Sequence, residues 1–371
     1  MPVPVARPLL NPALRLAWRD ERTLQIGADP QRAVVLTGVD VPVAAAIERL
    51  DGTRTWQQAL SAAADGGLAP ATAERLLHLL AELHLLVDAS RRSTTGLAPV
   101  ESRRLAADLA SWSVQPEGEA PPPSVTARRA AVVAVDGAGR VGATLVGLLA
   151  AAGVGEVVVR DRSRVGEHDL SPGGHHAGWV DRPRAQSALT TARSCAPWLG
   201  RRETRRGRER PRPSLVVLCP DAPEVAVGVA ERFLASGIAH VVGATYERVG
   251  VVGPLVRPGS TPCLRCLELH RRDRDPAWPL VAAQLAGRPD RVSRGSLAPA
   301  CDVVLAAQVA AALATAVLGH LDDPAGPHEL VGSRLELRPP SNQPRRRTWS
   351  AHPSCGCGWP GYATGPGRSP A

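Results

Sequence analysis

The chain contains no lysine, so all 44 of its permanently basic residues are arginine. This absence excludes Schiff-base chemistry and catalysis by an ε-amine, and it excludes a phosphate-binding loop of the G-x-x-x-x-G-K-[ST] type. Aromatic residues are also scarce, at 3% of the 371 residues. Because hydrophobic residues still make up 44% of the chain, leucine, valine and alanine must fill the core of a globular protein.

Targeting and membrane signals are absent as well. The N-terminal segment has no charged stretch followed by an apolar one, and no 18-residue apolar stretch is free of both polar residues and helix breakers. We therefore expect a cytoplasmic protein without a membrane partner, whose seven cysteines are metal ligands or free thiols. The net charge of +9 comes from scattered arginines and one cluster at residues 201–212, without interleaved aromatics. This pattern predicts no nucleic-acid partner.

Composition divides the chain into four parts. Residues 1–90 combine short strands with three helices, the last of which has an apolar stripe, and this is the pattern of a small winged-helix-like domain. Residues 91–128 are expected to form a helical and Pro-rich connector, and residues 359–371 a flexible tail. Residues 129–358 alternate apolar strands with helices, which predicts an α/β fold with a mostly parallel sheet covered on both faces. Residues 250–256 are expected to form a hairpin with the preceding strand.

A nucleotide-binding loop is predicted within residues 132–161. Gly137, Gly139 and Gly142 form a G-x-G-x-x-G motif where a strand ends and a helix begins, so the helix N-terminus faces a phosphate group. Asp161 ends the next strand, in the position of an acid that holds a ribose hydroxyl. The motif alone fits NAD as well as ATP, and a glycine-rich turn that binds nothing is the alternative.

A structural zinc site is predicted at the far end of the chain. Cys263 and Cys266 form a C-x-x-C pair, and Cys355 and Cys357 form a C-x-C pair about 90 residues later. Four thiolates can close a tetrahedron around zinc, which would attach the C-terminal segment to the domain. His352 is an alternative ligand, and four unrelated thiols are the alternative interpretation.

The loop and the cysteine pairs together resemble the ThiF/MoeB/HesA family, relatives of the ubiquitin-activating enzymes, over about residues 130–358. The resemblance implies a Rossmann-like homodimer that binds ATP with magnesium and adenylates the carboxylate of a peptide or small protein. It implies that Asp161 holds the ribose, that Arg184 replaces a phosphate-binding lysine, and that Asp221 assists magnesium and phosphate. Arg184 and Asp221 are therefore the catalytic candidates, and Arg184 also belongs to the candidate nucleotide site.

Two positions depart from the family pattern Asn-Leu-x-Arg-Gln, because Asp169 stands for the asparagine and Pro172 for the arginine. In the family that arginine lies against the phosphates, where a fixed positive charge stabilises developing negative charge. We therefore expect a nucleotide pocket that is retained and a catalytic apparatus that is reduced.

The front of the chain resembles ThiF-like partner proteins of thiazole/oxazole cyclodehydratases. This resemblance implies a PqqD-like element that binds a leader peptide as an added strand, with residues 23–27 and 33–38 as the candidate sheet edges. A DNA-binding winged helix is the alternative, but helix 69–83 is not basic.

Two functional interpretations remain. The first is an ATP-dependent adenylyltransferase of the ThiF type. The second is a catalytically degenerate scaffold that binds a leader peptide for a separate modifying enzyme. A nicotinamide dehydrogenase fits less well, because it leaves the four cysteines without a role.

Overall fold

The computed structural model describes residues 5–91, 97–112, 124–200, 212–221, 226–286, 302–341 and 343–358. The chain divides into two compact units, Met1–Pro122 and Pro123–Ala371. Most of the expected Pro-rich connector, nearly all of the arginine cluster and the expected flexible tail lie outside the described residues.

The N-terminal unit contains two small antiparallel sheets, β1–β5 and β2–β3–β4, together with four helices. The elements are β1 (Pro8–Leu10), β2 (Leu16–Asp20), β3 (Thr23–Ile26), β4 (Val34–Thr37), α1 (Val41–Glu48), α2 (Trp56–Asp65), α3 (Pro70–Glu82), β5 (Leu86–Asp88) and α4 (Pro99–Trp112). Thr55 starts α2 in a capping box with Gln58, which satisfies two backbone N–H groups at the start of the helix. The apolar face of α3 buries Leu76, Leu77 and Leu80 in the core of this unit.

The order of the three-stranded sheet corrects one prediction. β3 lies in the centre, where it pairs with β2 on one side and β4 on the other. Residues 23–27 are therefore not an edge available for an added strand, because both rows of backbone groups in β3 are paired. The predicted segment 33–38 contains β4, which is an edge, and β2 is an edge that the sequence did not indicate.

The C-terminal unit contains a mixed sheet in the order β12–β11–β10–β9–β8–β6–β7. Its elements are α5 (Val125–Ala130), β6 (Val132–Asp136), α6 (Arg140–Ala151), β7 (Glu156–Arg160), α7 (Arg184–Cys195), β8 (Leu215–Leu218), α8 (Ala226–Ala235), β9 (His240–Tyr246), β10 (Val249–Val256), α9 (Leu264–Arg274), α10 (Trp278–Ala286), α11 (Val303–Asp322), β11 (Ser333–Leu337) and β12 (Arg345–Thr348). Strands β7, β6, β8 and β9 are parallel, and β10, β11 and β12 extend the sheet in antiparallel fashion. The predicted α/β fold and the predicted hairpin of residues 250–256 are confirmed.

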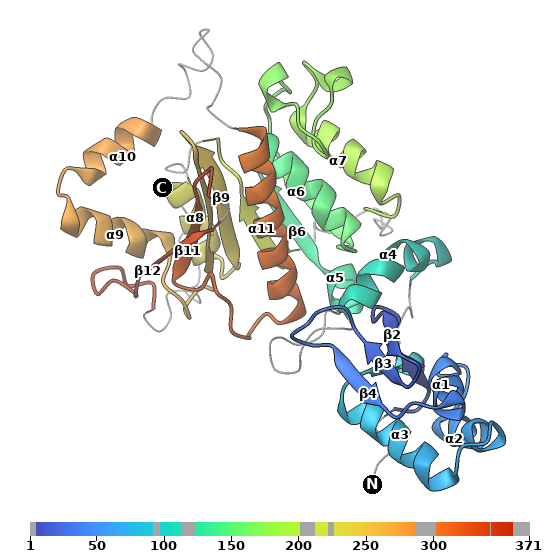
Figure 1. Ribbon diagram of the computed structural model, residues 1–371. Coiled ribbons are helices and arrows are strands. Elements are labelled where there is room, and N and C mark those ends of the chain that lie inside the picture. The colour runs from blue at the N-terminus through green and yellow to red at the C-terminus, as the bar shows by residue number, and fades with distance from the viewer. Residues whose placement is uncertain are drawn as a thin grey trace. The chain divides into compact units, whose positions relative to one another are not determined.

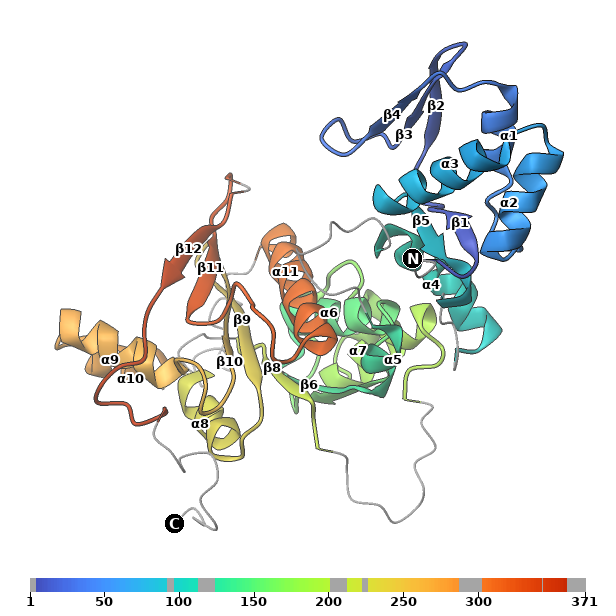
Figure 2. The same ribbon diagram turned by 90° about the horizontal axis from the view of Figure 1, so that it is seen from below.

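Helices cover both faces of this sheet. Helices α6, α7 and α11 pack on one face, and α8 and α9 lie on the other (Figures 1 and 2). The side chains of β6 alternate accordingly, since Val133 and Val135 face the first layer and Ala134 faces the second. This arrangement places the carboxyl ends of β6, β7 and β8 together at one end of the sheet.

Helix α11 has a length and composition that suit a membrane span. Among the described residues it is the one such helix, with a mean hydropathy of 1.8 over a window that is 50% buried. In this structure its apolar side chains, including Val309, Leu313 and Val317, pack in the main core. The helix therefore occupies the position of a core helix against the sheet.

Candidate functional site

The glycine-rich loop joins β6 to α6 as predicted, and two of its glycines are required by space. Gly137 has φ +98°, and a Cβ there would lie 2.1 Å from the carbonyl oxygen of Cys219. A Cβ at Gly142 would lie 2.0 Å from the carbonyl oxygen of Gly137. At Gly139, a Cβ would approach Oδ1 of Asp221 to 3.0 Å. The loop therefore packs tightly on β8 and keeps the start of α6 open toward Asp221.

Asp161 follows β7 and is bound to the glycine loop. Its Oδ2 accepts a hydrogen bond of 2.7 Å from the backbone N–H of Ala138, and its Oδ1 accepts one of 2.7 Å from Ser163 N–H. The carboxylate is thereby fixed at the end of the parallel strands, where a ribose would lie in the Rossmann-like arrangement.

Arg184 is the first residue of α7 and lies buried among three carboxylates. Its Nε and NH2 donate to the two oxygens of Asp169 at 2.8 Å each, a bidentate pair. Its NH1 donates to Asp221 Oδ2 at 3.2 Å and lies 3.6 Å from Asp161 Oδ2. Burial opposes the charge of Arg184, but Asp221 and Asp169 outweigh it and raise the pKa of the guanidinium above its usual value. The predicted residues Asp161, Arg184 and Asp221 are thus brought together, but Arg184 is already engaged.

His175 is a buried residue of this site that sequence reasoning missed. Its Nε2 lies 2.6 Å from the carbonyl oxygen of Ala138, and its Nδ1 lies 2.8 Å from Oγ of Ser187. Burial lowers the pKa of His175, so the neutral ring connects the glycine loop to α7. The signal in the sequence was weak, because His175 lies in a Gly-rich turn with no spacing relation to the loop.

Two cavities lie beside the loop. One of about 660 Å³ is lined by residues of β6, β7, β8 and α8, among them Val159, Asp161 and Val229, and is large enough for a nucleoside. The other, of about 30 Å³, lies at the start of α6 beside Gly139, Asp169 and Asp221, at what we call the phosphate end because the family resemblance implies phosphates there. Arg140 also lines the smaller cavity, and sequence reasoning did not single it out.

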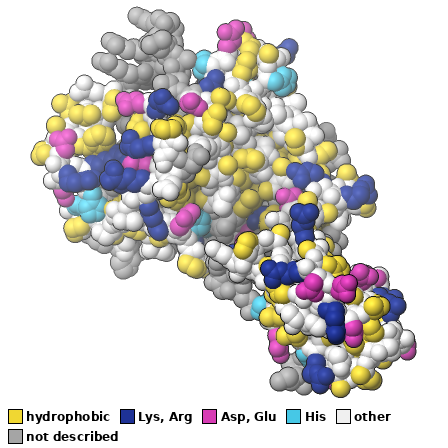
Figure 3. All heavy atoms as spheres, in the orientation of Figure 1, with side chains coloured by type: hydrophobic (Ala, Val, Ile, Leu, Met, Phe, Trp, Pro, Cys, Tyr) yellow, Lys and Arg dark blue, Asp and Glu magenta, His cyan; other side chains and the backbone are white. Residues whose placement is uncertain are grey.

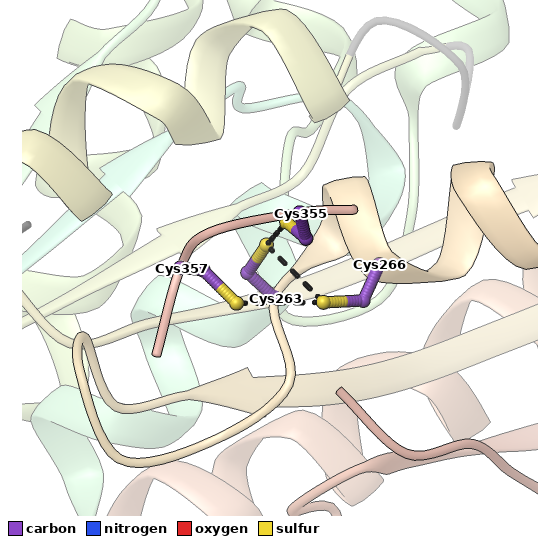
Figure 4. A group of neighbouring side chains, drawn as sticks. All are labelled: Cys263, Cys266, Cys355 and Cys357. Carbon is purple, nitrogen blue, oxygen red and sulfur yellow. Dashed lines mark hydrogen bonds between the residues drawn. The ribbon is translucent and has the colours of Figure 1, made fainter. Parts of the chain in front are cut away.

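The four predicted metal ligands form one buried cluster (Figure 4). The sulfur of Cys263 lies 3.9 Å from that of Cys266 and 3.5 Å from that of Cys355, and Cys266 lies 3.4 Å from Cys357. These distances are too long for disulfides. They bracket the S···S separation of about 3.8 Å that a tetrahedral zinc site with Zn–S bonds of about 2.3 Å requires. The residues therefore fit a closed structural metal site.

The cluster contains one thiol that ionises readily. A hydrogen bond from Cys263 lowers the pKa of Cys266 to about 4, and burial raises the pKa of Cys357 to about 11. His352, the alternative ligand, instead lies with its Nε2 at 2.7 Å from Asp273 Oδ2. The four sulfurs are therefore the donor set, and a dication would convert the remaining thiols to thiolates.

Comparisons with known proteins agree with this geometry. Residues 122–358 match the ThiF family. This chain belongs to the ThiF family. No curated protein matches the sequence.

Among solved structures, this ThiF-family chain is similar to the microcin C7 biosynthetic enzyme MccB in complex with N-formylated MccA, at 13% identity, a TM-score of 0.64, and coverage of 95% of this chain and 99% of that one. It is similar to E. coli MccB with ATP at 14% identity, a TM-score of 0.63, and the same two coverages. It is also similar to PaaA, at 16% identity, a TM-score of 0.63, and coverage of 91% of this chain and 98% of that one. At these identities the likeness establishes the fold.

Proposed function

We propose that this ThiF-family protein binds a leader peptide through its N-terminal unit and delivers it to a separate modifying enzyme, and that its nucleotide site does not turn ATP over. The observation that carries the proposal is the engagement of Arg184 by Asp169, Asp221 and Asp161. A guanidinium held by three carboxylates has little attraction left for a phosphate.

The charges at the phosphate end support this proposal. The family pattern implies Lys, Arg and Asn beside two Asp, a neutral set. In this chain Arg184 contacts Asp161, Asp169 and Asp221, a net charge of −2, and Pro172 stands in the sequence where the pattern has the Arg. Arg140 at the same cavity brings one further positive charge and leaves the group net negative. A triphosphate is therefore repelled unless a cation accompanies it.

The exposed edge of the N-terminal sheet supports peptide binding. β4 is an edge strand, and Val35 on it is 40% exposed. An extended peptide adds to such an edge through backbone hydrogen bonds, and exposed apolar side chains supply contact area. The fold likeness to MccB, which was solved with MccA, is in accord with this role.

A specific observation favours adenylation as the second candidate. The cavity of about 660 Å³ beside Asp161 has room for adenosine. Asp221, whose side chain is 55% exposed, is placed to hold magnesium, and the ion would offset the negative charge at the phosphate end.

In either function the four cysteines hold one zinc ion, in a structural rather than catalytic role. The support is the number of ligands, since four protein thiolates leave no open position for a substrate.

The deciding experiment measures ATP binding by calorimetry, with and without Mg²⁺, and ATP–pyrophosphate exchange with candidate leader peptides. We expect peptide binding without exchange. Peptide-dependent exchange that disappears in Asp221→Ala would instead establish adenylation and overturn the scaffold proposal.

Peptide docking is tested by placing a charge on the edge strand. Val35→Glu should weaken leader-peptide binding, measured by fluorescence anisotropy, because the carboxylate must be desolvated under an added strand. Val41→Glu is the matched control, since Val41 is 83% exposed at the start of α1 and lies outside the sheet. Equal binding by both variants would place the peptide elsewhere.

A further inference from the structure

A second large cavity lies at the antiparallel end of the C-terminal sheet, away from the glycine loop. Its volume is about 680 Å³, and its walls come from α9 and from the segment that contains β11 and β12. Five arginines line it: Arg271, Arg274, Arg334, Arg338 and Arg347. Figure 3 shows basic side chains gathered on the face where α9, β11 and β12 lie.

Glu336 is the central acid of this cavity and balances only part of the charge. It is buried, and it accepts from Arg334 at 2.7 Å and from Arg338 at 3.3 Å, with Arg347 at 3.4 Å. The cavity's other acid, Asp273, is already paired with Arg272 and His352. The guanidiniums around Glu336 therefore retain a net positive charge toward the cavity.

Two buried donors at the cavity have no acceptor. Nε of Arg334 and Nε1 of Trp349 are both inaccessible to solvent and without a hydrogen-bond partner among the described residues. Buried donors that lack a partner cost free energy, but atoms that solvent cannot reach are equally closed to a ligand, so the exposed guanidiniums of this cavity carry the argument for binding. Tyr246 and Leu267 add apolar surface to the same walls.

Protection of the sheet edge explains only some of these arginines. β12 is an edge strand, and charged residues on such a strand prevent pairing with other chains. Arg274 on α9, however, lines the same cavity from the opposite wall, as does Arg271, which also donates to Glu268 at 2.9 Å. Convergence from two elements is a property of a binding site rather than of a protected edge.

We propose that this cavity binds an acidic segment of a peptide or protein, whose carboxylates meet the arginines and whose apolar side chains rest on Trp349, Tyr246 and Leu267. The site goes beyond the function proposed above, because it requires neither the nucleotide cavity nor the edge of β4. A volume of about 680 Å³ far exceeds a single phosphate ion, and the mixed apolar and cationic lining matches a peptide.

The test uses a short fluorescein-labelled peptide rich in glutamate and leucine, and the same peptide with glutamine at each glutamate. Anisotropy with the full chain should report binding of the acidic peptide only, weakening as salt is added. The double variant Arg274→Gln, Arg338→Gln removes one guanidinium from each wall and should lower the affinity on the order of tenfold. Arg345→Gln is the matched control, because Arg345 is exposed on β12 but does not line the cavity.

Several results would overturn the proposal. Equal losses in the double variant and in Arg345→Gln would indicate general charge attraction. Equal binding of the glutamine peptide, or preferential binding of single-stranded RNA over the acidic peptide, would contradict the stated ligand. A thermal melt of each variant separates loss of binding from loss of folding, and Val35→Glu, which tests the leader-peptide edge, should leave this affinity unchanged.

Discussion

Two charge clusters in the C-terminal unit are built with opposite signs. At the glycine loop, one buried guanidinium, Arg184, is surrounded by three carboxylates. At the antiparallel end, one buried carboxylate, Glu336, is surrounded by three guanidiniums. The C-terminal unit thus presents negative charge at the glycine loop and positive charge at the antiparallel end of its sheet.

The clusters also differ in how far they are closed. Around Arg184, the side chains of Asp161 and Asp169 are 8% and 4% exposed. Around Glu336, those of Arg338 and Arg347 are 54% and 45% exposed. In the first cluster Asp221 alone is exposed, at 55%, whereas in the second two guanidiniums are available to a ligand. The first cluster thus exposes negative charge and the second positive charge.

Removal of the proposed zinc ion should have the largest effect and should separate the two clusters. The four cysteines anchor the segment that follows β12. Loss of the ion should therefore free Arg347 from Glu336 and leave Arg184 in place. We expect the free energy of unfolding to fall by more than about 5 kcal/mol. Cys355→Ser should abolish a zinc content of about one ion per chain, measured by mass spectrometry, and should weaken acidic-peptide binding. The control Cys195→Ser changes an exposed thiol and should change neither. A metal-free chain of full stability would refute the zinc site.

Arg184→Met should have the next largest effect. It leaves Asp161 and Asp169 buried without their cation, and an uncompensated buried charge costs about 3–5 kcal/mol. Urea denaturation measures this loss. Asp221→Asn is the control, and because Asp221 is more than half exposed it should cost less than about 1 kcal/mol. Similar losses in both variants would mean that the cluster is not closed as described.

The sequence predicted the parts of this molecule that depend on short-range patterns. The loop glycines, the four cysteines and the alternation of strands and helices follow from local spacing and steric need. The engagement of Arg184 could not be predicted, because it joins Asp161 and Asp169, which follow β7, to Asp221, which follows β8. The cavity around Glu336 was missed for the same reason, since β11 and β12 are short and their arginines resemble a solvated charge run. The edge assigned to residues 23–27 was wrong because pairing order is a property of the sheet.

Acid titration should have an intermediate effect that belongs to neither cluster. Burial lowers the pKa of His320 to about 4, with Arg257 and His328 nearby acting in the same direction. Below about pH 6.5, His320 is protonated in the unfolded chain but not in the folded chain. Its contribution to the free energy of unfolding is therefore full above about pH 6.5 and is lost as the pH falls toward 4. The loss is about 2–3 kcal/mol from this residue.

His320→Gln should remove that share of the pH dependence in denaturation measured between pH 7 and pH 4.5. The carboxylate of Glu336 contributes little there, because its arginine partners lower its pKa and the stability that this gives is lost only as the pH falls below the ordinary glutamate value of about 4.5. An unchanged pH slope in His320→Gln would assign the acid sensitivity elsewhere.

Glu336→Gln should have the smallest effect on stability and the clearest effect on binding. Arg338 and Arg347 can turn toward water when their acceptor becomes neutral, so we expect a loss of about 1–2 kcal/mol, less than for Arg184→Met. The same change removes one negative charge from the cavity, which should raise its affinity for the acidic peptide severalfold. Glu231→Gln, an exposed substitution on α8, should alter neither quantity. If Glu336→Gln weakened peptide binding instead, Glu336 would be needed to hold the arginines in their binding orientation, and the cavity would resemble the closed cluster at Arg184 after all.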